Sequence, residues 1–284
     1  MGNPEVPFRF FDLHVLRVAQ VGPGMVRVTF GGEDLKALVS DGRDQRLKLF
    51  LAHEGQDAPI VPVEAGEEWF AAWTAMDANE RAVMRTYTVR DARRDPDEMD
   101  IDFAMHGDTG PASRWARRAQ PGDRVIVIGP SAPDNGGADF NPPEGSEWVL
   151  IAADETALPA VEGILRWLPA DLPARVWLSV DHAGDKRELL SAAQVDVRWL
   201  VRDGGPDTLA AAVEGAELPD GVVYAWIAGE AGMVRAVRRN LVRDRGIDRK
   251  AVTFTGYWRR GATDDDLLAE SLAGQEPHLP GADE

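Results

Sequence analysis

The sequence contains no cysteine among its 284 residues. This absence excludes disulfides, thiol catalysis, cysteine zinc sites and protein-ligated iron–sulfur clusters. Long apolar runs are missing too, since no stretch approaches the roughly 20 residues of a membrane-spanning helix. The first residues also lack the charged start and apolar core of a secretory signal peptide. We therefore expect a cytoplasmic protein with no membrane partner.

Positive charge is scarce as well. The chain has 31 Lys and Arg against 48 Asp and Glu, a formal net charge of −17. Nucleic acids and anionic membranes require a positive field, so we expect neither as a partner. A small anionic ligand remains compatible with this charge if a local basic pocket binds it.

Metal-binding patterns are also missing. The histidines follow no HxxxH or HExxH spacing, which predicts isolated side chains and no metal site. They are His14, His53, His106, His182 and His278.

Short strand patterns separated by turn residues fill the first half of the chain, which predicts an antiparallel β-barrel. They lie at residues 10–18, 25–30, 44–51, 85–90, 99–105 and 125–128. One helix is predicted among them, at residues 111–119, with Pro111 near its start.

The second half alternates strands with helices, which predicts a parallel sheet covered on both faces. Strand patterns lie at residues 148–152, 175–180, 197–201, 223–228 and 252–258, and helix patterns at 158–168, 207–214 and 231–245. The Pro- and Gly-rich loop 131–147 marks a boundary. We predict domains 1–143 and 144–262, then an acidic tail 263–284 with a short helix candidate at 267–272. The order of a barrel before an α/β sheet resembles the ferredoxin-reductase-like flavoproteins.

Two motifs in the barrel suit a ligand that carries a phosphate and a flat ring. In Arg85-Thr-Tyr87-Thr88, the period of a strand places Arg85 and Tyr87 on one face. In residues 106–116, a glycine turn opens a helix, which exposes backbone amides as a phosphate site. An exposed strand and a routine strand–turn–helix are the alternatives.

These motifs resemble the siderophore-interacting proteins, FAD-dependent ferric-siderophore reductases. The resemblance spans about residues 8–261 and rests on five blocks in order. They are RTYTVR at 85–90, DFAMHGDTGPASRWARRAQPGDRVIVIGP at 102–130, ADETALPAV at 153–161, WIAGEAGMVRAVRR at 226–239 and GYWRRG at 256–261.

The resemblance implies site residues for FAD in the first domain. Arg85 binds an FAD phosphate, Tyr87 stacks on the isoalloxazine and Thr88 lies near its N5. A second group holds the pyrophosphate, namely His106, Gly107, Gly110, Pro111, Ala112 and Ser113.

In the second domain the resemblance places a nicotinamide nucleotide beside two strand ends. Asp154, Thr156 and Ala157 follow one strand, and Gly229 and Glu230 follow another. The first segment has no GxGxxG pattern, so its residues alone indicate only a helix start with acidic residues. The arginines of residues 231–245 form either a solvated helix face or a basic wall.

The implied reaction passes a hydride from NADPH or NADH to FAD and then single electrons to the iron of a ferric siderophore. Hard oxygen ligands hold Fe(II) more weakly than Fe(III), so reduction releases the metal. We expect a monomer. The alternatives are a general NAD(P)H:flavin or ferredoxin-type reductase, or a ferric-siderophore binding protein without turnover.

Basic residues are expected where an anionic siderophore docks. Lys48 lies in an apolar strand pattern, and Arg259 and Arg260 end the last strand. Alternation places the two arginines on opposite faces, so one of them is expected to join Lys48.

For the nucleotide, Asp181 just after a strand would favour the ribose hydroxyls of NADH. The basic pair Lys186 and Arg187 would instead bind the 2′-phosphate of NADPH, which is the nucleotide that we expect.

Overall fold

The structure is a computed structural model that describes residues 7–105, 110–133, 135–262, 266 and 270. The chain divides into two units between Ala138 and Asp139, and the turn Gly22–Gly24 groups with the second unit. This division lies in the loop that the sequence marks as a boundary. Most of the helix predicted at 267–272 lies outside the described residues.

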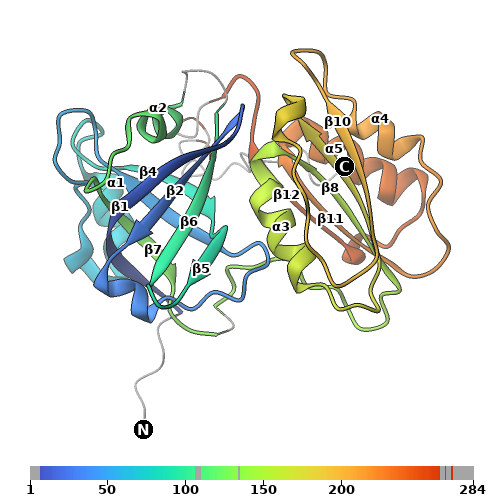
Figure 1. Cartoon of the computed structure of the whole chain (residues 1–284), viewed down its shortest axis with the longest axis horizontal. Coiled ribbons are helices and arrows are strands. Elements are labelled where there is room, and N and C mark those ends of the chain that lie inside the picture. Colours follow the sequence, from blue (N-terminus) through green and yellow to red (C-terminus); the bar gives the residue numbers. More distant parts are fainter. Residues whose placement is uncertain (1–6, 106–109, 134, 263–265, 267–269, 271–284) are drawn as a thin grey trace, which may run out of the picture. The chain divides into compact units, whose positions relative to one another are not determined.

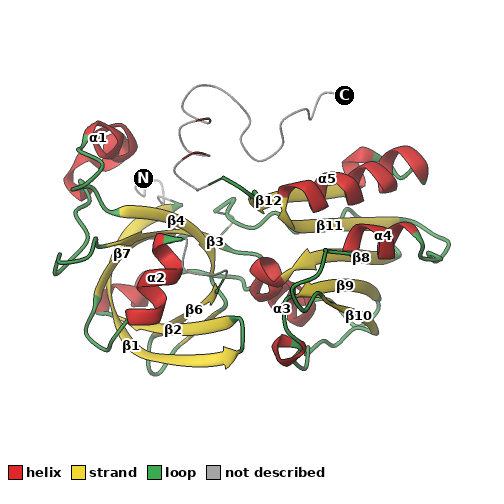
Figure 2. Ribbon diagram, turned by 90° about the horizontal axis from the view of Figure 1, so that it is seen from above, coloured by secondary structure: helices red, strands yellow, loops and turns green. Residues whose placement is uncertain are grey.

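Unit 1 is built on a seven-stranded antiparallel sheet that curls into a barrel-like shape, as predicted (Figures 1 and 2). Its strand order is β4-β3-β7-β1-β2-β6-β5. The strands are β1 (Phe8–Gly22), β2 (Met25–Gly31), β3 (Arg46–Leu51), β4 (Val83–Thr88), β5 (Asp91–Arg93), β6 (Glu98–Ala104) and β7 (Arg124–Pro130).

The barrel core follows from the two-residue period of its strands. Along β1, Phe11, Leu13 and Val15 are fully buried, while the residues between them face outward. Alternate residues of a strand point to the same side of the sheet, so this pattern directs one row of apolar side chains inward. The same inner face of β3 presents Leu47 and Leu49 to the core.

The described residues of unit 1 form two α-helices, one more than the sequence pattern predicts. The predicted helix is α2 (Pro111–Arg118), and the additional one is α1 (Trp69–Ala75). In α1, Trp73 is buried, and its indole N–H donates to the Ala82 carbonyl at 3.1 Å. Only one residue of this short helix is buried, and its partner lies nine positions along the chain. The periodicity of these seven residues was therefore too weak to predict helix α1 from the sequence.

Unit 2 is a five-stranded parallel sheet in the order β10-β9-β8-β11-β12, as predicted (Figure 1). Its strands are β8 (Trp148–Asp154), β9 (Ala174–Val180), β10 (Val195–Val201), β11 (Val223–Glu230) and β12 (Val252–Trp258). Its helices are α3 (Leu158–Trp167), α4 (Leu209–Glu214) and α5 (Ala231–Arg239). The helix predicted at 231–245 is α-helical to Arg239 and continues as a π-helical turn, Asn240–Asp244.

Helices cover both faces of this sheet. Val149, Ile151 and Ala153 of β8 belong to the core shared with α3. The alternating residues Trp148, Leu150 and Ala152 belong to the core shared with α4 and α5. Every residue of β8 is buried, as expected for the central strand of a doubly covered parallel sheet.

The strand order reverses beside β8. From β8 the chain adds β9 and β10 on one side and later adds β11 and β12 on the other. All five strands are parallel, so their carboxyl ends share one edge, and ligands of such sheets bind where the order reverses. That point lies between the ends of β8 and β11, at Asp154 and Glu230. Among the described residues, no helix is long and apolar enough to cross a membrane.

Candidate functional site

Strand β4 carries the first group of predicted site residues. Arg85 is buried, and its guanidinium donates to the Met84 carbonyl at 2.8 Å. Tyr87 lies two residues further along the strand and is half-buried, and the centroid of its ring is 4.5 Å from that of the Phe103 ring. Thr88 is buried at the end of the strand. Arg85 and Tyr87 pair with Leu49 and Leu47 of β3, so they lie on the face that carries the barrel core.

Helix α2 contacts β4 and begins at the second group of predicted residues. Gly110 is the N-cap, and a glycine has no side chain to accept a hydrogen bond from the first turn. Pro111 occupies the first helical position, where a missing N–H costs nothing. The following amides, of Ala112 and Ser113, lie in the first turn, where a helix has no carbonyl partner to offer them. This end of α2 therefore suits an anion.

Lys48 of β3 lies on the other side of the sheet from Arg85. It is cross-strand from Thr86 and donates to the Thr86 hydroxyl at 2.7 Å. Thr86 is exposed between the inward-facing Arg85 and Tyr87. The strand period thus separates Lys48 from the face that carries the core.

In unit 2, the predicted residue Asp154 is enclosed by the protein. Its Oδ1 accepts from the amide and hydroxyl of Thr156, at 2.9 and 2.5 Å. Its Oδ2 accepts from the amide of Glu230 at 2.7 Å and from the indole N–H of Trp258 at 2.8 Å. The carboxylate therefore joins the carboxyl ends of β8, β11 and β12.

Burial raises the pKa of Asp154 to about 6, and the neighbouring charge of Glu155 adds to this increase. The hydrogen bonds from Thr156, Trp258 and the Glu230 amide act in the opposite direction, because they stabilise the ionised form. Asp154 thus changes charge nearer neutral pH than an ordinary aspartate.

Close approach of β8 and β11 requires a glycine. Gly229 has φ +136°, and a Cβ at this position would lie 2.5 Å from Cγ of Asp154. Any side chain here would displace the carboxylate or the strand. Gly229 is predicted from the sequence to lie at a ligand, and in the structure it permits the close packing of β11 against Asp154.

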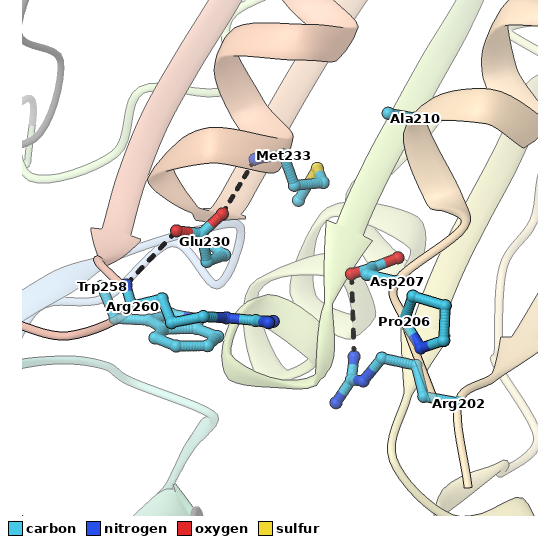
Figure 3. Close-up of a pocket in the computed structure, with 8 residues that line it drawn as sticks. All are labelled: Arg202, Pro206, Asp207, Ala210, Glu230, Met233, Trp258 and Arg260. Carbon is cyan, nitrogen blue, oxygen red and sulfur yellow. Dashed lines mark hydrogen bonds and ion pairs between the residues drawn. The ribbon is translucent and has the colours of Figure 1, made fainter. Parts of the chain in front are cut away.

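A pocket of about 320 Å³ lies at this edge of the sheet (Figure 3). Its walls come from the ends of β10, β11 and β12 and from the first turns of α4 and α5. The lining residues are Arg202, Pro206, Asp207, Ala210, Glu230, Met233, Trp258 and Arg260.

Arg202, at one side of the pocket, forms hydrogen bonds with other residues of the protein. Its guanidinium donates to Glu155 Oε1 at 2.5 Å and to the Ser179 hydroxyl at 3.0 Å. Asp181 and Asp207 lie within 3.8 Å of it. The side chain is 12% exposed, so these groups rather than water surround most of it.

At the opposite side, Glu230 caps α5 and holds the chain that follows β12. One oxygen, Oε2, accepts from the amide of Met233 at 2.9 Å, and Oε1 accepts from the amide of Arg260 at 3.3 Å. The Arg260 side chain points into the space between Glu230 and Asp207 (Figure 3).

The two predicted arginines diverge. Arg259 forms a two-point ion pair with Glu270, at 2.5 and 2.9 Å, whereas Arg260 lines the pocket. The carboxylate of Glu270 raises the pKa of Arg259, because it stabilises the charged guanidinium.

Comparison with known families covers both units. Residues 14–134 match the siderophore-interacting FAD-binding domain, and residues 146–261 match the siderophore-interacting protein domain. The chain belongs to the siderophore-interacting protein family. The resemblance drawn from the five sequence blocks is confirmed, and unit 1 contains the FAD-binding domain.

Individual members of the family align over nearly the whole chain. Ferric vibriobactin reductase ViuB of Vibrio cholerae is 32% identical over 89% of this chain and 90% of its own length. The NADPH-dependent ferric-chelate reductase of Escherichia coli is 32% identical over 88% of this chain and 93% of its own. A siderophore utilization protein from T. fusca has a solved structure with a TM-score of 0.78 and 35% identity, covering 91% of this chain and 95% of its own.

The ferredoxin-reductase-like fold class is also confirmed. The ferredoxin reductase of carbazole 1,9a-dioxygenase has a TM-score of 0.63 and covers 90% of this chain and 71% of its own. At 16% identity this likeness concerns the fold alone.

The residues of this siderophore-interacting protein fit FAD in two respects. A buried arginine and a half-buried tyrosine share one face of β4, and the adjoining helix α2 has a glycine as its N-cap. A guanidinium and the first-turn amides of a helix suit phosphate, and an aromatic face suits a flat ring. His106 and Gly107 lie outside the described residues. The individual contacts of the other residues to FAD remain predictions.

Sequence reasoning missed part of the pocket, although it named Glu230 and Arg260. Arg202 follows β10 and Asp207 precedes α4, and neither belongs to a quoted motif. Their position in the sequence could have identified them, because both residues follow the carboxyl end of a parallel strand, where ligands bind.

Arg187, which the sequence favoured for a nucleotide phosphate, pairs with the buried Glu162 of α3 at 3.1 Å, whereas Lys186 is exposed. Within the described residues, no cluster of acids and histidines forms a metal site.

Proposed function

We propose that this protein reduces ferric siderophores with electrons from a nicotinamide nucleotide, delivered through bound FAD. The observation that supports this most is the cradle of unit 1, where Arg85 and Tyr87 share a face of β4, which the helix α2, with its glycine N-cap, contacts. When bound, FAD would link two-electron hydride transfer from the nucleotide to one-electron reduction of iron. One nucleotide molecule thus reduces two ferric ions and leaves an oxidised nucleotide and a proton.

The chain's own residues supply binding and orientation. We propose that Arg85 binds a phosphate of FAD, that Tyr87 covers the ring and that the amides of Ala112 and Ser113 bind the pyrophosphate. Thr88 adds a hydroxyl at the end of the strand. The pocket of unit 2 that Glu230 and Arg260 line is the proposed nucleotide site, because ligands of parallel sheets bind at the carboxyl ends of the strands.

Ferric siderophores are the proposed oxidant, as the names of ferric vibriobactin reductase and of the ferric-chelate reductase suggest. No protein ligand to iron is needed, because the siderophore already holds the metal. Lys48 and Arg259 are the proposed contacts for an anionic siderophore. In a chain of net charge −17, such an anion needs local positive groups.

The electron donor also bears on the cellular compartment in which the protein acts. Reduced nicotinamide nucleotides are cytoplasmic, so we propose that the protein acts there. We also propose that it acts as a monomer, because one chain contains both the cradle and the pocket. Light scattering of the purified protein measures that state directly.

The decisive experiment is anaerobic reduction of the purified holoprotein. We expect a yellow protein that NADPH or NADH bleaches and that a ferric siderophore then reoxidises, with Fe(II) captured by a chromogenic chelator. Bleaching without Fe(II) release would indicate a general flavin reductase. A colourless protein that binds ferric siderophore would indicate the non-catalytic alternative.

Lys48→Ala tests the siderophore contact. We expect a roughly twofold to fivefold higher KM for an anionic ferric siderophore, less at high salt, with unchanged flavin reduction. Lys36→Ala is the matched control, because Lys36 is an exposed lysine of the same unit that pairs with Glu33. Equal effects of the two variants would contradict the assignment of Lys48.

A further inference from the structure

The Arg260 side chain differs from those of Arg202 and Arg259 in its hydrogen-bond and ion-pair partners. Arg202 is held by Glu155 and Ser179, and Arg259 is held by Glu270. The Arg260 guanidinium has no hydrogen bond or ion pair within the part of the chain that the structure describes. The residue is exposed, and only its backbone amide is bound, by Glu230. It is therefore the cation of the pocket that remains available to a ligand.

The other walls of the pocket suit the remaining parts of a nucleotide. The carboxylates of Asp207 and Glu230 can accept hydrogen bonds from ribose hydroxyls, as acidic residues do in other parallel-sheet nucleotide sites. Trp258 and Met233 offer an apolar surface to a ring. Glu230 already occupies the start of α5, where it accepts the Met233 amide, so that helix end does not serve a phosphate.

We propose that Arg260 binds a phosphate of the nicotinamide nucleotide, while Arg259 alone of the two arginines serves the siderophore. The assignment rests on the proposed function, since it names the contact that the electron donor makes in unit 2. Two adjacent arginines would thus bind two different substrates, the siderophore at Arg259 and the nucleotide at Arg260. Glu230 positions Arg260 through its backbone amide, and Glu270 holds Arg259 away from that role.

Direct binding tests this assignment without turnover. NADP⁺ and NAD⁺ are titrated calorimetrically into the holoprotein and into Arg260→Ala, Arg260→Lys and Arg259→Ala. We expect Arg260→Ala to weaken nucleotide binding by about tenfold or more, because a charge-assisted hydrogen bond is lost. Arg260→Lys should retain part of the affinity, and Arg259→Ala should bind both nucleotides like the parent.

The two nucleotides separate the possible phosphates. Weaker binding of NADP⁺ and NAD⁺ alike assigns Arg260 to the shared pyrophosphate, and weaker binding of NADP⁺ alone assigns it to the 2′-phosphate. Unchanged binding of both, or an equal loss in Arg259→Ala, overturns the assignment. The Fe(II) release assay on the parent tests the proposed function separately, because it does not depend on which arginine binds the nucleotide.

Discussion

The indole N–H of Trp258 donates to Asp154 at 2.8 Å, which ties the end of β12 to the end of the central strand β8. The same carboxylate accepts the amide of Glu230 at the end of β11. Two strand ends that bear pocket residues, those of β11 and β12, are therefore tied to the central strand by one buried acid. The pocket geometry rests on a group whose own side chain is not among its lining residues.

The charge of Asp154 should make stability depend on pH. Its pKa is about 6 in the folded protein and near 3.8 when exposed, so the folded state binds the extra proton between these values. Stability from this group is then lost as the pH rises through that window. Relative to the parent, Asp154→Asn should gain roughly 1–3 kcal/mol between pH 4 and pH 7 in urea unfolding. A pH-independent difference, or one of opposite sign, would contradict this pKa shift.

Replacing Gly229 should destabilise unit 2. Gly229→Ala places a Cβ 2.5 Å from the Asp154 carboxyl carbon at a φ of +136°. We expect the free energy of unfolding to fall by about 2–4 kcal/mol, because the carboxylate is fixed by four donors and cannot withdraw. Gly246→Ala is the control, since Gly246 has φ +72° with nothing within 4 Å of its Cβ position. Equal losses would mean that backbone strain alone, rather than the clash, sets the cost.

Arg85 should govern the retention of FAD. Arg85→Ala removes a charge-assisted hydrogen bond to phosphate worth about 1.5–3 kcal/mol, so we expect FAD affinity to fall roughly 10- to 150-fold. The dissociation constant is measured by adding FAD to the apoprotein and following flavin fluorescence. Arg17→Ala is the control, because Arg17 is an arginine of β1 that pairs with Glu98. A purified Arg85→Ala protein with full flavin and unchanged affinity would remove Arg85 from the site.

Glu270 should compete with an anionic siderophore for Arg259. The pair lies at 2.5 and 2.9 Å, so the siderophore must displace this carboxylate to reach the guanidinium. Glu270→Gln should lower the KM for an anionic ferric siderophore about twofold to fivefold and leave flavin reduction by nucleotide unchanged. Glu33→Gln removes an acid from unit 1 and controls for net charge. An unchanged or higher KM in Glu270→Gln alone would show that Arg259 does not receive the siderophore.

Side-chain periodicity was sufficient for most of the fold. The alternation of Phe11, Leu13 and Val15 and the apolar run of β8 are local patterns that report which faces are buried. They led to an antiparallel barrel followed by a parallel sheet. Helix α1 was missed, because the burial of its Trp73 depends on Ala82 and on Phe50 of the distant strand β3.

The sequence by itself determined the family, the two fold classes and the residue types available for phosphate and ring binding. These are properties of short segments, because a strand period or a glycine turn is complete within about ten residues. Only the tertiary structure decided which charges are available. It buried Asp154 among four donors, paired Arg187 with Glu162, and turned Arg259 toward Glu270 and Arg260 toward the pocket. Such choices depend on which distant segments meet, and no local pattern contains that information.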